Sequence, residues 1–80
     1  MSKLRVLSGK DIVKFLRKEG FEIEYGKGSH SKLFKLIGGK KESITIPLHK
    51  EIAEGTLRAI YNQASKFISE EKLRKYFYTN

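Results

Sequence analysis

Apolar residues recur at helical spacing near both ends of the chain. The first such segment predicts a helix over Gly9–Glu19, with Ser8 as its cap and Gly20 after its end. A second helix is predicted after the polar stretch 49–54, and a third begins at about Ser69. Each helix has one apolar side that must be buried. These sides consist of Ile12, Phe15 and Leu16 in the first helix, Leu57, Ile60, Tyr61 and Ala64 in the second, and Leu73, Tyr76 and Phe77 in the third.

Between the helices the pattern changes to a period of two, which is typical of strands. Three strands are predicted: one over Phe21–Tyr25, a second over Ser29–Ile37, and a third around residues 44–48 that Pro47 confines to an edge or an end. Glycine-rich turns at 26–28 and 38–41 join them into an antiparallel meander. The order α-β-β-β-α-α predicts an α+β fold, with a three-stranded antiparallel sheet, helices on one face and the other face free.

The register of the second hairpin decides how the two histidines of the chain lie. A turn at Gly39-Lys40 would place His30 opposite His49 across the sheet. A turn one residue longer would match Phe34 with Ile46, a better apolar pairing, and would move His49 to the other face. The sequence leaves these two registers open. Both place the histidines in one neighbourhood.

Length and charge indicate one small domain that binds a polyanion. The 80 residues (1–80) suffice for one domain, and 17 Lys and Arg against nine Asp and Glu give a net charge of +8. The excess is concentrated in Gly26–Lys50, which holds six lysines and one acid. The chain has no cysteine, no apolar run that could span a bilayer and no signal-peptide pattern, so we expect a cytoplasmic protein without membrane contact.

A histidine among lysines suits proton transfer on RNA, whose own 2′-hydroxyl is the nucleophile. A base, an acid and ammonium groups are in principle sufficient, so we expect no cofactor and no metal. His30 has the more suggestive setting. It follows Gly28-Ser29, whose backbone N–H groups could hold a phosphate, and it lies between Lys27 and Lys32. His49 taken alone is more typical of an ordinary surface or core histidine.

Five short motifs, in their order and spacing, resemble the HicA toxins over Ser8 to about Ala64. The resemblance implies a fold similar to the double-stranded-RNA-binding domain, an mRNA-cleaving activity and a HicB-like antitoxin as partner. The family's catalytic histidine falls on His30, whereas no catalytic role is carried over to His49. The motifs are Ser8-Gly9-Lys10, Gly20-Phe21, Gly28-Ser29-His30, Ile46-Pro47-Leu48-His49 and Gly55-Thr56-Leu57-Arg58-Ala59-Ile60.

Taken together, the sequence predicts the toxin of a type II toxin–antitoxin system, a metal-independent endoribonuclease. His30 is the expected catalyst and His49 a candidate second acid or base. Expected RNA contacts are Lys10, Lys27, Gly28, Ser29, Lys32 and Lys50.

Two other functions stay open. One is a non-catalytic RNA-binding module that recognises duplex shape, and the other is an interaction domain for an acidic protein. Tyr25 and Phe34 are expected in the core, unless they face the open side of the sheet, where they could stack on unpaired bases. The third helix is left open as a cap, a dimer contact or part of the antitoxin surface, and the oligomeric state is not indicated.

Overall fold

The computed structural model describes residues 3–79, with the side chain of Lys27 excepted. Its main sheet has the strand order β2-β3-β4, antiparallel throughout, and a separate small sheet pairs β1 with β5. The predicted α+β fold class is therefore confirmed, and the layout is compatible with that of a double-stranded-RNA-binding domain. The elements are β1 (Lys3–Leu4), α1 (Gly9–Lys18), β2 (Glu22–Lys27), β3 (His30–Ile37), β4 (Lys40–Pro47), α2 (Glu54–Ala64), α3 (Glu70–Phe77) and β5 (Tyr78–Thr79).

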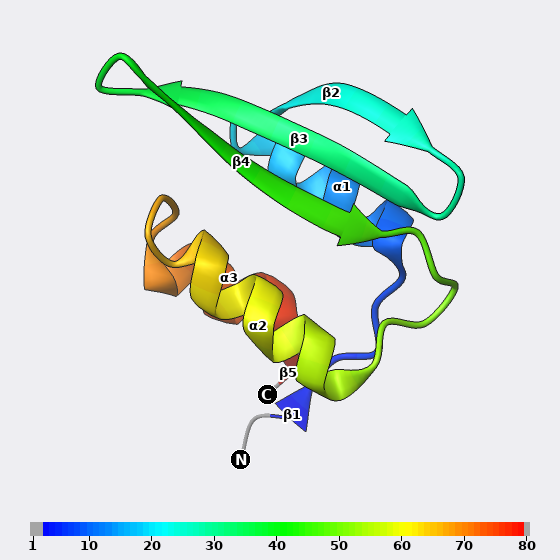
Figure 1. The fold of residues 1–80 in the computed structure, drawn as a ribbon. Coiled ribbons are helices and arrows are strands. Elements are labelled where there is room, and N and C mark those ends of the chain that lie inside the picture. The colour runs from blue at the N-terminus through cyan, green and yellow to red at the C-terminus, as the bar shows by residue number, and fades with distance from the viewer. Residues whose placement is uncertain (1–2, 80) are drawn as a thin grey trace.

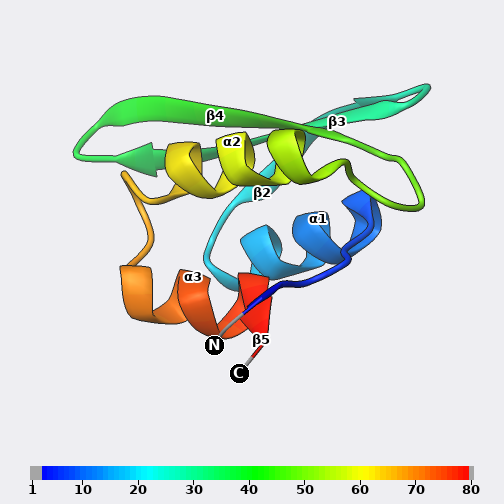
Figure 2. The ribbon, with the colours of Figure 1, turned by 90° about the horizontal axis from the view of Figure 1, so that it is seen from below.

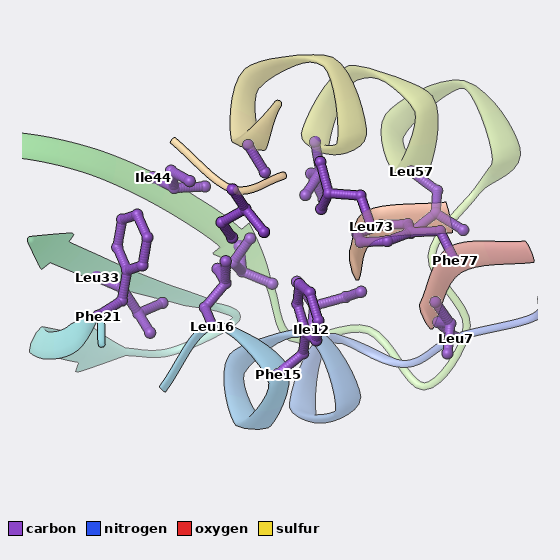
Figure 3. Packing of buried hydrophobic residues seen from close by; sticks show 14 of the residues in the cluster. Leu7, Ile12, Phe15, Leu16, Phe21, Leu33, Ile44, Leu57, Leu73 and Phe77 are labelled. Atoms are coloured by element: carbon purple, nitrogen blue, oxygen red, sulfur yellow. The ribbon is translucent and has the colours of Figure 1, made fainter. Parts of the chain in front are cut away.

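The helices α1 and α2 lie against one face of the main sheet, and α3 packs against them on the side away from the strands (Figure 1 and Figure 2). The three helices and the strands β3 and β4 contribute their apolar sides to one core between the layers (Figure 3). The opposite face of the sheet is not covered by any of the described elements. That open face belongs to the site described below. The largest fully buried side chains are Phe21, Phe77, Leu7, Ile12, Leu16, Leu33, Ile44, Ile46, Leu57 and Leu73.

The start of α1 is fixed both by its own cap and by the sheet. The Ser8 hydroxyl accepts a hydrogen bond from Asp11 N–H at 3.0 Å, and the Asp11 carboxylate accepts one from Ser8 N–H at 3.0 Å. Gly9 N–H donates to the His49 carbonyl at 2.9 Å. A methyl group on Gly9 would overlap the Pro47 carbonyl oxygen and would lie 2.7 Å from Leu48 Cα. Only glycine therefore permits this close approach of the helix to the end of β4.

Two glycines set the register between β3 and β4, and both registers considered from the sequence are wrong. Gly38 and Gly39 have φ of +60° and +80°, as a two-residue type I′ turn requires. Ile37 therefore pairs with Lys40, and Leu33 with Ile44. Leu33 is fully buried, so the core face of β3 carries Leu33 and not Phe34, which the longer-turn register would pair with Ile46.

The strand β2 departs from its predicted alternation because the ladder has an irregularity between Ile23 and Tyr25. Ile23 pairs with Leu33 on the helix side, whereas Tyr25 pairs with Lys32 on the open side. Ile23 is 45% and Tyr25 52% exposed, so the apolar face that the alternation predicts for this strand is not buried, and Tyr25 takes the alternative position on the open side. Phe21, which precedes the strand, supplies the buried contact instead.

The third helix closes the core. Phe77 is fully buried and makes edge contacts with the rings of Phe15 and Tyr61, at centroid distances of 5.9 and 5.4 Å. Tyr76 stacks on Phe15 at 4.3 Å, and its hydroxyl donates to the Asp11 carbonyl at 2.8 Å. Of the three roles left open for this helix, the structure supports the cap.

Candidate functional site

His30 is the first residue of β3, directly after a two-residue turn made by Gly28 and Ser29. Gly28 has φ of +60°, a left-handed conformation that glycine adopts without strain. Because His30 pairs with Lys27 on one side and with Pro47 on the other, its backbone is held within the ladder while its side chain is exposed. The fold therefore presents an imidazole at the open end of the sheet.

One contact orients the His30 ring. Its Nδ1 lies 3.1 Å from the Ser29 hydroxyl oxygen. A hydroxyl can donate or accept here, so it can support either tautomer of the ring. With Nδ1 engaged, Nε2 is the nitrogen that remains for a substrate. When the Nδ1–H donates to Ser29, Nε2 carries a free lone pair and can accept a proton.

His49 does not face His30 across the sheet, because the observed register places Pro47 there. The strand β4 ends at Pro47, and Leu48 N–H donates to the Ser29 carbonyl at 2.6 Å. Each histidine thus adjoins one partner of the same backbone hydrogen bond, and both are exposed. The expectation that they share a neighbourhood is met, although direct pairing is not.

The other predicted site residues gather around the same end of the sheet. Lys32 follows His30 by two positions in β3 and therefore faces the same way. Lys10 lies one residue beyond the Gly9–His49 hydrogen bond, and Lys50, next to His49, is exposed. The side chain of Lys27 lies outside the described part of the structure, so only its backbone position opposite His30 is known.

A basic groove that the sequence reading overlooked runs between α1 and the edge strand β2. It has a volume of about 660 Å³. The cations on its rim repeat at helical spacing along α1, and none of them forms an ion pair with another residue of the described range 3–79. The three- and four-residue spacing of these cations is the signal that could have revealed the groove. The rim consists of Lys10, Lys14, Arg17 and Lys18, and the remaining lining is Val13, Ile23, Gly26, Ser31 and Leu48.

Tyr25 and Phe34 both belong to the open face of the sheet. Tyr25 pairs with Lys32, and Phe34 lies two residues further along β3. The Lys32 ammonium is 5.9 Å from the Tyr25 ring centre, and the Lys41 ammonium is 4.9 Å from that of Phe34. Both rings therefore lie on the open side of the sheet, where they could stack on unpaired bases.

Within residues 3–79, no three side chains of His, Cys, Asp or Glu gather as they would to hold a metal ion. None of the helices in that range is long and apolar enough to cross a membrane.

A model of a known protein family matches most of the chain. The model of the family described as the HicA toxin of bacterial toxin–antitoxin systems matches residues 9–65. The match includes α1, the whole β2-β3-β4 sheet and α2. Searches among curated proteins and among solved structures gave no significant match.

Proposed function

The chain belongs to the HicA family of toxins from bacterial toxin–antitoxin systems, and on this premise we propose that it is an endoribonuclease that cuts mRNA with His30. The observation that carries the proposal is the exposed imidazole at the start of β3, with Nδ1 at 3.1 Å from the Ser29 hydroxyl and a lysine on the same face. This combination provides a proton acceptor beside a cation at a surface that RNA can reach.

In the proposed reaction, Nε2 of His30 removes the proton of a 2′-hydroxyl. The 2′-oxygen then forms a bond to the adjacent phosphorus, the bond from phosphorus to the 5′-oxygen breaks, and that oxygen takes up a proton as it leaves. The products are a 2′,3′-cyclic phosphate and a 5′-hydroxyl end. Lys32 would stabilise the extra negative charge on the phosphoryl oxygens in the transition state.

The reaction also needs a group that donates a proton to the leaving 5′-oxygen. His49 is a candidate because it is exposed and adjoins Leu48, which hydrogen-bonds to the residue before His30. It lies beyond the end of β4 and is not paired with His30, whereas direct pairing would have placed their Cβ atoms about 5 Å apart. Water is the alternative donor.

RNA would be bound by the basic residues around this end of the sheet. We assign phosphate contacts to Lys10, Lys27, Lys32 and Lys50, and backbone contacts to the turn of Gly28 and Ser29. This reaction uses protein side chains and the substrate's own hydroxyl, so activity is expected without a metal. A cytoplasmic location stays a prediction.

The partner in this proposal is a HicB-like antitoxin that is acidic, at least locally. We place it over Gly26–Lys50, where it would neutralise the lysines and cover His30 together. Gly26, Ser31 and Leu48 line the groove beside α1, so a protein on this surface would also reach the unpaired cations of that helix.

The deciding experiment compares the wild-type protein with His30→Ala in RNA cleavage and in growth arrest. We expect the variant to keep the circular-dichroism spectrum and melting temperature of the wild type, since the side chain is exposed, and to lose both activities. Gln63→Ala, which truncates an exposed polar side chain on α2 outside the proposed site, is the matched control and should keep both activities. A His30→Ala protein that still cleaves at the wild-type rate would refute the assignment.

The same assay addresses the metal and the main alternative. Cleavage should persist in EDTA, and a loss of activity that magnesium restores would overturn the metal-free mechanism. If wild-type protein binds RNA but never cleaves it, the non-catalytic RNA-binding module is the correct function.

A further inference from the structure

The open face of the sheet carries an exposed aromatic ring beside His30, and the proposed reaction does not use it. Tyr25 is 52% exposed and pairs with Lys32 on the side of the sheet away from the helices. The irregularity in β2 turns it to this face. No helix among residues 3–79 covers this face of the sheet (Figure 1).

We propose that Tyr25 stacks on an unpaired base of the RNA next to the scissile phosphate, so that the protein binds single-stranded RNA at this face. The proposal rests on the proposed function, because the RNA is the substrate inferred there. Tyr25 would position the RNA by contact with a base and would take no part in proton transfer.

The distances within the sheet suit neighbouring nucleotides. Tyr25 pairs with Lys32, and His30 lies two residues before Lys32 on the same face. Such diagonal neighbours in an antiparallel pair are about 7–8 Å apart, a step that one extended nucleotide can span. A base on Tyr25 would thus leave its adjoining phosphate near His30.

The charge around Tyr25 also fits a nucleotide. The Lys32 ammonium lies 5.9 Å from the centre of the ring, close enough to pair with the phosphate of a stacked base. Further along the face the environment is less favourable to phosphates, because Glu22 pairs with Phe34 and Glu24 binds Lys41 at 2.9 Å. We therefore assign the base to Tyr25, at the basic end, rather than to Phe34.

Stacking on Tyr25 requires a base that is not already stacked in a duplex. A flat sheet presents its aromatic rings to splayed single-stranded bases, whereas a duplex buries the faces of its bases within the helix. Leu36 of β3, which is 66% exposed on the same face, adds apolar surface. The face is therefore suited to single strands, despite a topology compatible with duplex-binding domains.

Binding is measured with His30→Ala protein, so that the RNA stays intact. In that background, Tyr25→Ala should weaken binding of a short single strand about 5- to 150-fold, whereas Tyr25→Phe should retain the affinity. Val6→Ala, at a position that is 73% exposed before α1, is the control for loss of apolar surface elsewhere. A duplex of the same sequence should bind more weakly than the single strand.

A second readout is independent of whether Tyr25→Ala folds. A strand carrying 2-aminopurine beside the scissile step should lose fluorescence when the His30→Ala protein binds, because stacking quenches that base. Unchanged fluorescence at saturation would overturn the proposal. So would a duplex that binds as tightly as the single strand, or a Tyr25→Ala protein that binds RNA normally and fails only to bind the antitoxin.

The two proposals can fail separately. Cleavage by wild-type protein together with an unaltered affinity of Tyr25→Ala would refute the stacking site and leave the nuclease intact. RNA binding that depends on Tyr25, without any cleavage, would support the stacking site and refute the nuclease.

Discussion

Gly9→Ala is the substitution for which the structure predicts the largest loss of stability from a single methyl group. The new Cβ would overlap the Pro47 carbonyl oxygen and would lie 2.7 Å from Leu48 Cα and 2.9 Å from Pro47 C. All three are backbone atoms, so no side-chain rotation can relieve the overlap. The helix α1 would have to move away from the end of β4.

That movement has two costs. Overpacking in a well-packed site typically costs about 1–3 kcal/mol, and stretching the Gly9–His49 hydrogen bond, now 2.9 Å, forfeits about 1 kcal/mol. A total of roughly 2–4 kcal/mol is a large part of the stability of so small a domain. Melting temperatures of domains of this size change by about 4–8 °C per kcal/mol, so the variant should melt about 8–30 °C lower.

Thermal unfolding followed by circular dichroism tests this, with Gly55→Ala as the matched control. Gly55 also lies in the first turn of a helix, but a Cβ there would meet nothing within 4 Å. Gly55→Ala should therefore keep the wild-type stability or gain up to about 1 kcal/mol from helix propensity. Equal melting temperatures for the two variants would refute the close-approach argument.

Three further predictions concern charge. The Ser8 backbone N–H donates to Asp11 and lowers the pKa of that carboxyl below its ordinary value of 3.8. The carboxylate therefore stabilises the fold fully above pH 3.8, and this stabilisation is lost as the pH falls through the lowered pKa. Asp11→Ala should therefore melt below the wild type at pH 7, by a difference that shrinks in acid, and a constant difference would contradict the capping role. Lys32→Ala should lower the slope of log RNA affinity against log salt by about one. Lys72→Ala removes a lysine of α3 that pairs with Glu19, and it should leave the slope unchanged. Titrating the antitoxin into a complex of His30→Ala with labelled RNA should release the RNA, and a stable ternary complex would place the inhibitor elsewhere.

The helices and the fold class could be predicted from the sequence because their signals are local. Ile12 and Leu16 share one face of α1, and Leu57, Ile60 and Ala64 share one face of α2, so their burial follows from the helical period alone. The small sheet of β1 and β5 could not be predicted, because each strand has two residues and depends on contact between distant parts of the chain.

The strand register needed information that periodicity does not contain. Leu33, Phe34 and Leu36 are all apolar, so either face of β3 could have been the buried one. The positive φ of Gly38 and Gly39 fixes the register of the hairpin between β3 and β4. The irregularity between Ile23 and Tyr25 moves Tyr25 to the open face, and no residue type in the sequence indicates it. The histidine could thus be identified from the sequence, whereas its neighbours across the sheet could not.

The placement of His30 depends on its backbone, and this makes its chemistry separable from its folding. The ladder holds its main chain between Lys27 and Pro47, and the hydrogen bond from Leu48 to Ser29 closes the same end of the sheet at 2.6 Å. Among the described residues, its side chain has a single hydrogen-bonding contact, with the adjacent Ser29 hydroxyl. Truncating the imidazole therefore removes no core packing and leaves no buried polar group without a partner, so a change in cleavage caused by His30→Ala reports on the reaction itself rather than on the stability of the domain.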